Sequence, residues 1–276
     1  MNEDTLEPDD RAGLFGRRSL LFLPASNPRA VAKARDSAAD MVILDLEDAV
    51  RAEDKAAARA AAAEAVASAW PMPVAIRVNG VGSEWHSLDL DSVAGSSAEY
   101  AVVPRAISAH LIKGVADVTG KPVLAMIETA AGVLAAAEIA PATAGLIAGT
   151  NDLAADLRLP ANSGRASLNT ALQLIVLAAR AAGVAAFDGV YNVLDDEAGM
   201  LAQAEEGRRL GFDGKSLIHP NQIALCHRAF APTEAELDRA RRLVEAYNGG
   251  AERFDGAMVE AMHVEAARRL LERAGR

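Results

Sequence analysis

The sequence predicts an α/β protein folded as a (β/α)8 TIM barrel with a C-terminal helical extension. Short apolar runs recur along the 276 residues, and most are continuous rather than alternating, which is typical of parallel strands covered on both faces. Alanine-rich segments of helical composition separate the runs, for example residues 52–69 and 167–183. Strands that alternate with helices indicate a parallel sheet. Eight such units in about 200 residues suit a barrel, which takes roughly 250 residues.

The eight predicted strands follow one another along the first 220 residues. They lie at residues 19–25, 41–47, 74–80, 100–106, 123–129, 145–152, 185–191 and 214–220. The alternative is a doubly wound sheet, which usually carries a glycine-rich phosphate-binding turn after its first strand. The corresponding turn here, residues 24–30, reads PASNPRA and contains no glycine, so the barrel is favoured.

The same pattern predicts three segments. Residues 1–16 are acidic and polar at their start and are expected to form a disordered N-terminal tail. Residues 17–231 are expected to form the barrel, and any catalytic site is expected in this domain. After residue 232 the pattern becomes wholly helical, with a Gly-Gly break at 249–250. Residues 232–276 are therefore a helical extension, expected to pack on the barrel or to reach over a barrel mouth, its own or a neighbour's.

The composition restricts the partners and the compartment. A formal net charge of −10 argues against nucleic acid, which needs basic surfaces. No segment reaches the ~20 apolar residues of a membrane span, and the acidic N-terminus is unlike a secretory signal. The single cysteine, Cys226, allows no disulfide within the chain and fits a reducing compartment. We therefore expect a cytoplasmic protein, with Cys226 a buried thiol of an amphipathic helix rather than a nucleophile.

Acidic residues and arginines gather at the ends of the predicted strands. In a barrel, the C-terminal ends of the strands meet at the face that carries the active site. The interiors of the runs are almost free of charge apart from Asp45. The runs end on Glu47 with Asp48, Arg77, Arg105, Glu128, Asp152, Asp188 and His219. A solvated edge would mix lysine, serine, threonine and glutamine, so this set favours a functional site over a plain surface.

Glu128 and Asp152 form the strongest candidate pair. Each ends an apolar run, and because the two runs are consecutive strands, the carboxylates should lie side by side. Adjacent acids repel each other unless one is protonated or a cation lies between them. Mg²⁺ is commonly held by one or two protein carboxylates, with water and substrate oxygens completing its shell. The alternative is that each carboxylate caps the helix that follows it.

Glu47 and Asp48 follow the second strand, and Arg77 lies in the third. The two acids could hold metal-bound waters or form an ion pair with an arginine. The guanidinium of Arg77 offers a planar fork to a substrate carboxylate or carbonyl oxygen, or to Glu47 or Asp48 as a structural partner. Spacing alone leaves both interpretations open. His219, which precedes a proline, is better explained as a hydrogen-bonded structural residue than as a base.

Six motifs carry a resemblance to a known family, in an order and spacing that span about residues 17–275. They read RRSLLFLPASNPR, DLEDAV, RVNG, MIET, GTNDLAADL and GFDGKSLIHPNQI. The chain resembles the citrate lyase beta subunit within the HpcH/HpaI aldolase superfamily, whose members include malyl-CoA and citramalyl-CoA lyases. The resemblance implies a (β/α)8 barrel, a homo-oligomer that is a trimer or a multiple of three, and Mg²⁺-dependent cleavage or formation of a carbon–carbon bond.

The resemblance also implies roles for individual residues. By motif match, Glu128 and Asp152 are the Mg²⁺ ligands, and Arg77 binds the substrate. Glu128 borders the substrate as well. Glu47 and Asp48 support the metal-bound waters.

Three further positions differ in part from those of the relatives. Arg105 and Lys215 match substrate-binding positions near the thioester, but Arg105 replaces the more usual lysine. Thr150 and Asn151 precede Asp152 where many relatives carry an acidic residue, so this segment has one negative charge fewer. Glu260 stands where many relatives place an aspartate that acts as acid/base from a neighbouring subunit.

The implied reaction is a retro-Claisen or retro-aldol cleavage of a short 3-hydroxyacyl-CoA of the citryl, citramalyl or malyl type. Its products are a 2-oxo acid and an acyl thioester. Three alternatives stay open: a citrate lyase complex subunit that acts on a carrier-bound acyl group, a binding protein that has lost turnover, and a metal-dependent aldolase for free 2-oxo acids.

Overall fold

The structure is a computed structural model that describes residues 13–274. Of the tail predicted over residues 1–16, residues 1–12 lie outside the described residues. Residues 13–16 form a turn. Leu14 of this turn is fully buried in the barrel core. The chain divides into two compact units, one that ends at Ala229 and one that begins at Phe230.

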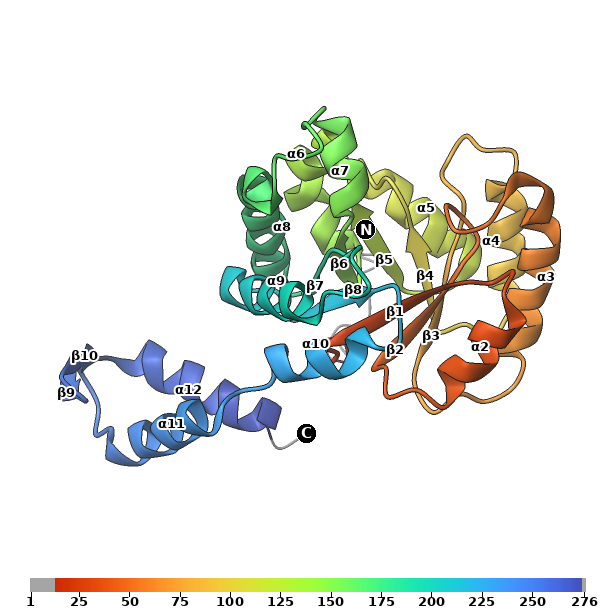
Figure 1. The fold of residues 1–276 in the computed structure, drawn as a ribbon. Helices are drawn as coiled ribbons and strands as arrows, with labels where there is room; N and C mark the ends of the chain where they lie inside the picture. The colour runs from red at the N-terminus through yellow and green to blue at the C-terminus, as the bar shows by residue number, and fades with distance from the viewer. Residues whose placement is uncertain (1–12, 275–276) are drawn as a thin grey trace. The chain divides into compact units, whose positions relative to one another are not determined.

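Eight parallel strands close into a barrel in which β1 pairs with β8, so the predicted TIM-barrel fold is confirmed (Figure 1). The strands are β1 Ser19–Pro24, β2 Met41–Asp45, β3 Val74–Arg77, β4 Tyr100–Val103, β5 Val123–Ile127, β6 Gly145–Ala148, β7 Ala185–Asp188 and β8 Gly214–Leu217. Each is shorter than the apolar run that predicted it. The last residues of most runs therefore belong to loops at the C-terminal ends of the strands.

The helices of the barrel unit lie outside the ring of strands (Figure 1). They are α2 Pro28–Arg35, α3 Lys55–Val66, α4 His86–Ala94, α5 Ala109–Thr119, α6 Ala130–Ile139, α7 Thr150–Asp156, α8 Asn169–Ala182, α9 Glu197–Leu210 and α10 Gln222–Phe230, with 3-10 turns η1 Ala52–Asp54, η2 Ala140–Ala142 and η3 Arg165–Leu168. Side-chain caps begin several of them. Asn27 accepts from the Ala30 backbone N–H at 3.1 Å, and Thr129 accepts from that of Gly132 at 3.0 Å.

Alternation along the strands separates the barrel interior from the layer between strands and helices. The interior core includes Ile43 on β2, Ala75 on β3 and Leu124 on β5. Two residues further along each strand, the same inward face carries Asp45, Arg77 and Met126, respectively. The interior thus changes from a packed apolar core to charged groups at the C-terminal ends of the strands.

The C-terminal unit contains α11 Glu234–Ala246, a hairpin of β9 Glu252–Phe254 and β10 Ala257–Val259, and α12 Ala261–Ala274. The predicted C-terminal helices are thus present, but the segment is not wholly helical, because a short hairpin joins them. The hairpin turns at Asp255 and Gly256, whose φ angles are 49° and 83°. Asp-Gly favours such turns because both residues tolerate positive φ. Leu243 on α11 and Val264 on α12 pack in the unit's own apolar core.

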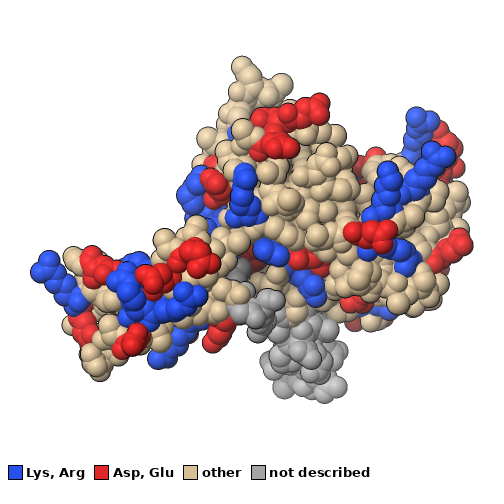
Figure 2. All heavy atoms as spheres, turned by 60° about the horizontal axis from the view of Figure 1, so that its bottom comes forward, with Lys and Arg blue, Asp and Glu red and all other residues tan. Residues whose placement is uncertain are grey.

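The charge of the surface is mixed rather than uniform. On the face shown in Figure 2, Lys and Arg residues are interspersed with Asp and Glu residues instead of forming one basic area. Within residues 13–274, no helix combines the length and apolar composition that a bilayer crossing requires.

Candidate active site

Arg77 is held by Asp45, its neighbour across the β2–β3 pair. The strand register places these two residues opposite each other. Arg77 Nε contacts Asp45 Oδ1 and Nη2 contacts Oδ2, both at 2.6 Å, so the fork is bidentate. Both residues are buried. Burial alone would lower the pKa of Arg77, but the bonds to Asp45 outweigh this effect and raise it. The structural partner of Arg77 is therefore chiefly Asp45, which the sequence analysis had assigned no role.

The remaining nitrogen of Arg77, Nη1, faces Glu47 and Asp48 on the loop that follows β2. It lies 2.9 Å from Glu47 Oε2 and 3.7 Å from Asp48 Oδ2. The contact with Glu47 is an ion pair without hydrogen-bond alignment. Burial raises the pKa of Glu47 to about 8. The positive charge of Arg77 opposes this rise, and the negative charges of Asp48 and Glu128 add to it. The predicted association of Glu47, Asp48 and Arg77 is thus present in the structure.

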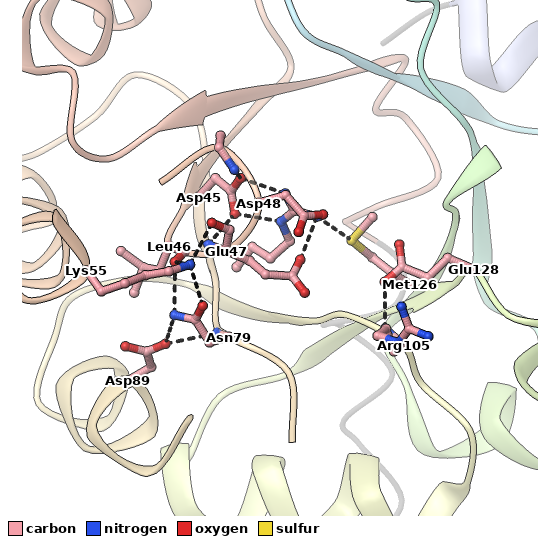
Figure 3. Close-up of polar contacts among 12 residues, drawn as sticks. Asp45, Leu46, Glu47, Asp48, Lys55, Asn79, Asp89, Arg105, Met126 and Glu128 are labelled. Carbon is pink, nitrogen blue, oxygen red and sulfur yellow. Dashed lines mark hydrogen bonds and ion pairs between the residues drawn. The ribbon is translucent and has the colours of Figure 1, made fainter. Parts of the chain in front are cut away.

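Lys55 fixes the loop that carries Glu47 and Asp48 (Figure 3). Its Nζ donates to the carbonyl oxygens of Leu46 and Glu47, both at 2.7 Å, and to Asn79 Oδ1 at 2.6 Å. Asn79 in turn donates to Asp89 Oδ2 at 2.6 Å. This buried network joins the first turn of α3 to the loops after β2 and β3, and the sequence analysis did not anticipate it.

Glu128 follows β5 and is only 2% exposed. Its Oε1 accepts from the Arg105 backbone N–H at 2.7 Å (Figure 3). Its Oε2 has no hydrogen-bond partner among residues 13–274. Burial raises the pKa of Glu128 to about 7, the Arg105 bond opposes the rise, and the charge of Asp152 adds to it. A buried carboxylate oxygen without a partner is costly, so it indicates a ligand site.

Asp152 lies in the first turn of α7 rather than at the end of β6. The alternative that both acids act as helix caps is not what the structure shows. Thr129, not Glu128, caps α6. The N-cap residue of α7 is Gly149, and no side chain forms a cap bond there. Asp152 is half-buried, and its charge acts on Glu128. The predicted proximity of the two carboxylates is therefore present, although a helix rather than a strand end supplies Asp152.

Most of these groups line one pocket of about 400 Å³ at the C-terminal ends of the strands, although Glu47 and Lys55 do not. Its charged lining consists of four carboxylates and one guanidinium, from Asp45, Asp48, Glu128, Asp152 and Arg77. In the described part of the chain, no three or more His, Cys, Asp or Glu side chains are placed to share a metal ion. Carboxylate oxygens are the hard donors that Mg²⁺ prefers, and one or two of them from the protein commonly hold it, with water and ligand oxygens in the remaining positions.

Gly149 leaves the space that the Glu128 side chain occupies. A Cβ at this position would overlap the Cβ and Oε2 atoms of Glu128. We expect Mg²⁺ to stabilise wild type in a thermal unfolding assay, and Gly149→Ala to displace the carboxylate and abolish this stabilisation. Gly114→Ala is the control, because a Cβ there meets no atom within 4 Å. Wild-type behaviour of Gly149→Ala would show that the Glu128 position does not matter.

Arg105 and Lys215, the residues predicted to bind the substrate near the thioester, are not in the pocket lining. Arg105 adopts a left-handed backbone conformation with φ of 49°, which directs its N–H at Glu128, while its side chain is exposed. Lys215 is fully buried and is not among the residues that line the pocket. Its Nζ pairs with Asp188 Oδ2 at 2.9 Å and bonds the Gly189 carbonyl oxygen. A buried ion pair thus replaces the predicted substrate contact of Lys215, because its side chain points out of the barrel interior.

The other candidate residues lie apart from this pocket lining. Glu260 belongs to the C-terminal unit and immediately precedes α12, where its backbone N–H bonds His263 Nδ1 at 3.0 Å. His219 Nδ1 accepts from the Asn221 backbone N–H at 3.2 Å, which agrees with a structural role. Burial raises the pKa of Cys226 to about 12, so it is a buried thiol, as expected.

Comparisons with known proteins agree with the resemblance drawn from the motifs. Residues 18–220 match the HpcH/HpaI aldolase/citrate lyase family, and residues 165–276 match a family of C–C bond lyases of the TIM-barrel fold. The chain is 42% identical to the (3S)-malyl-CoA thioesterase of Cereibacter sphaeroides, over 93% of this chain and 94% of that protein. It is 36% identical to the citrate lyase subunit beta of Escherichia coli, over 94% of this chain and 93% of that protein.

A solved structure extends the comparison to the whole fold. The crystal structure of protein CitE from Mycobacterium tuberculosis, in complex with magnesium, acetoacetate and coenzyme A, matches with a TM-score of 0.84 at 35% identity. The match covers 94% of this chain and 98% of that chain. The chain therefore belongs to the HpcH/HpaI aldolase/citrate lyase family.

Proposed function

We propose that this protein is a Mg²⁺-dependent enzyme that acts on a short 3-hydroxyacyl-CoA, of the malyl, citramalyl or citryl type, and breaks its carbon–carbon bond. The products are a 2-oxo acid and an acyl thioester. The observation that carries the proposal is the free, buried Oε2 of Glu128, in one pocket with Asp152 and Arg77. The solved relatives that hold magnesium with oxaloacetate or with acetoacetate and coenzyme A support it.

Glu128 and Asp152 would hold the cation. When bound, Mg²⁺ supplies Lewis acidity that polarises the oxygens of the hydroxy acid. Glu47 and Asp48, fixed by Lys55 through the loop backbone, would hold water molecules beside it. The excess of carboxylates over guanidinium groups in the pocket favours this occupancy, because a divalent charge relieves their mutual repulsion.

Arg77 would stabilise the negative oxygen of the thioester enolate that forms when the bond breaks. Asp45 fixes the plane of the guanidinium through Nε and Nη2, so the nitrogen that does not bond Asp45 is Nη1, which pairs with Glu47 at 2.9 Å. The cleavage also needs a base that takes the hydroxyl proton and an acid that protonates the enolate carbon. We assign this proton transfer to Glu260 of a neighbouring copy, in a homotrimer or a multiple of it, with residues 232–276 reaching over that barrel mouth.

Hydrolysis of the thioester is the second candidate. The 42% identity to a (3S)-malyl-CoA thioesterase favours it. That protein's name describes hydrolysis of the thioester bond, which leaves the carbon–carbon bond of the hydroxy acid intact. The same pocket would then bind the hydroxy acid intact, while water attacks the thioester carbon and free coenzyme A leaves.

The products distinguish the two reactions. Purified protein is incubated with Mg²⁺ and malyl-, citramalyl- or citryl-CoA, and 2-oxo acid and free thiol are measured in parallel. The lyase is expected to release oxo acid without thiol, and EDTA is expected to stop it. Thiol without oxo acid would establish the hydrolase. Binding of coenzyme A with neither product, on any substrate, would contradict both activities and indicate a binding protein.

The affinity for Mg²⁺ is expected to rise with pH. Glu128 has a pKa of about 7 in the ligand-free protein, so it is mostly protonated at pH 6 and mostly ionised at pH 8. Since the cation binds the ionised form, its dissociation constant should fall about tenfold over this range. Because the folded state holds this proton more tightly than the unfolded chain, the ligand-free protein loses stability as pH rises from about 4.5 through 7.

Titration calorimetry at both pH values, in buffers of different ionisation enthalpy, measures the affinity and the proton released. At pH 6, about one proton should leave Glu128 for each ion that binds. At pH 8 almost none should leave, because Glu128 is already mostly ionised. An affinity independent of pH would show that Glu128 is not a ligand.

A further inference from the structure

Ser216 lies on the inward face of β8, at the same level of the barrel as the charged groups. Its neighbour Lys215 points the other way and pairs with Asp188 between the strands and the helices. Alternation along the strand therefore directs Ser216 into the barrel. It is 2% exposed and lines the same pocket as Arg77 and Glu128.

The hydroxyl of Ser216 has no partner. Its Oγ is buried, and nothing within residues 13–274 forms a hydrogen bond with it. Two other buried hydroxyls of the barrel are paired: Thr119 donates to the Val115 carbonyl at 2.7 Å, and Ser19 bonds His227 Nε2 at 2.8 Å. Ser83 Oγ has no partner among the described residues either, but it lies outside the pocket lining. A buried hydroxyl without a bond costs free energy that an alanine would avoid. The unpaired hydroxyl therefore points to a partner that arrives from the pocket.

The surroundings restrict what that partner can be. The pocket that Ser216 lines is apolar in part, through Phe22, Met126 and Ile218. Arg77 already bonds Asp45 with two nitrogens and pairs with Glu47 through the third. A small anion that enters the pocket would thus meet a largely engaged guanidinium and, at Ser216, a neutral donor without a partner among residues 13–274.

We propose that Ser216 is a substrate-binding residue that donates a hydrogen bond to a carboxylate or carbonyl oxygen of the short oxo-acid part of the ligand. This rests on the proposed function, to which it adds a specificity-determining contact. The contact comes from β8, a strand that supplies neither of the two proposed metal ligands. Because the residue is almost fully buried, only a small polar head reaches it, and the coenzyme part of the substrate does not.

The test compares Ser216→Ala with wild type in the full-length protein. Its thermal midpoint without ligand should be unchanged or higher, because the lost hydroxyl had no partner. Mg²⁺ alone should bind as in wild type. The affinity for oxaloacetate or pyruvate in saturating Mg²⁺, measured by calorimetry, should fall about ten- to hundredfold, as for loss of a hydrogen bond to a charged group.

Two variants serve as controls. Ser216→Thr keeps the hydroxyl and should bind the oxo acid within a few-fold of wild type. Ser83→Ala also removes a buried hydroxyl without a partner among the described residues, but Ser83 is not in the pocket lining, so this variant should bind normally.

The outcomes separate this inference from the proposed function. If wild type binds the oxo acid and Ser216→Ala binds it equally well, the inference is overturned while the proposed function stands. A loss of stability in Ser216→Ala with unchanged affinity would make the residue structural. An equal loss in Ser216→Thr and Ser216→Ala would overturn the role of the hydroxyl. If wild type binds no oxo acid with Mg²⁺, both proposals fail.

Discussion

Replacing Glu128 with glutamine is expected to slow substrate turnover by about a thousandfold or more, because a metal ligand supplies several kcal/mol of transition-state stabilisation. The amide oxygen of glutamine can still accept the Arg105 N–H that Oε1 accepts at 2.7 Å, so the loop after β4 keeps its anchor. The variant removes a buried charge and keeps the size of the side chain. Its thermal midpoint without metal, above pH 7, should therefore equal or exceed that of wild type.

Glu138→Gln is the matched control for this variant. Glu138 accepts the Ala109 backbone N–H at 3.2 Å in a similar way, but it is exposed on α6. It should retain full activity and the full stabilisation by Mg²⁺. If Glu128→Gln kept both, the assignment of Glu128 as a metal ligand would be wrong.

Arg77→Lys is expected to lower turnover by far more than tenfold, to about a hundredth of wild type, and to destabilise the fold. Lysine keeps the charge but cannot form the two bonds of 2.6 Å to Asp45. Asp45, which is 1% exposed, would lose one of its two bonds to the guanidinium, while the backbone N–H groups of Glu47 and Ala49 still bond its oxygens. Loss of one hydrogen bond between charged groups costs about 1.5–3 kcal/mol. Initial rates and urea unfolding measure the two effects.

Arg180→Lys separates these effects from a general cost of losing arginine. Arg180 pairs with Asp213 at 2.8 Å on the outer side of the barrel and takes no part in the pocket. We expect it to lose some stability and no activity. An Arg77→Lys variant with near-normal rates but lowered stability would make Arg77 a structural residue only.

The sequence was sufficient to predict the barrel because its two periodicities are local. Continuous apolar runs form the strands, and alanine-rich segments form the helices between them. The hairpin at Asp255 and Gly256 was missed, although Asp-Gly is a strong local signal, because the flanking strands have only three residues each.

The candidate site was predictable where the chemistry lies at strand ends and not where it depends on register. Glu47, Arg77 and Glu128 were identified because charge follows a buried run. The bidentate partner Asp45 was not, since only the β2–β3 register places it opposite Arg77. Lys55 lies in a helix, and nothing in its local sequence shows that its Nζ reaches the loop after β2. The role of Lys215 came from the motif resemblance, and its pairing with Asp188 outside the barrel interior depends on the direction of its side chain on β8, which a motif does not show.

Soaking crystals of the protein in Mn²⁺ and oxaloacetate and recording anomalous scattering at the manganese edge tests the central claim most directly. We predict one peak bonded to carboxylate oxygens of both Glu128 and Asp152, with the oxo acid between it and Arg77. An anomalous map with no peak at these two carboxylates, from crystals in which the pocket is open to solvent, would contradict the account.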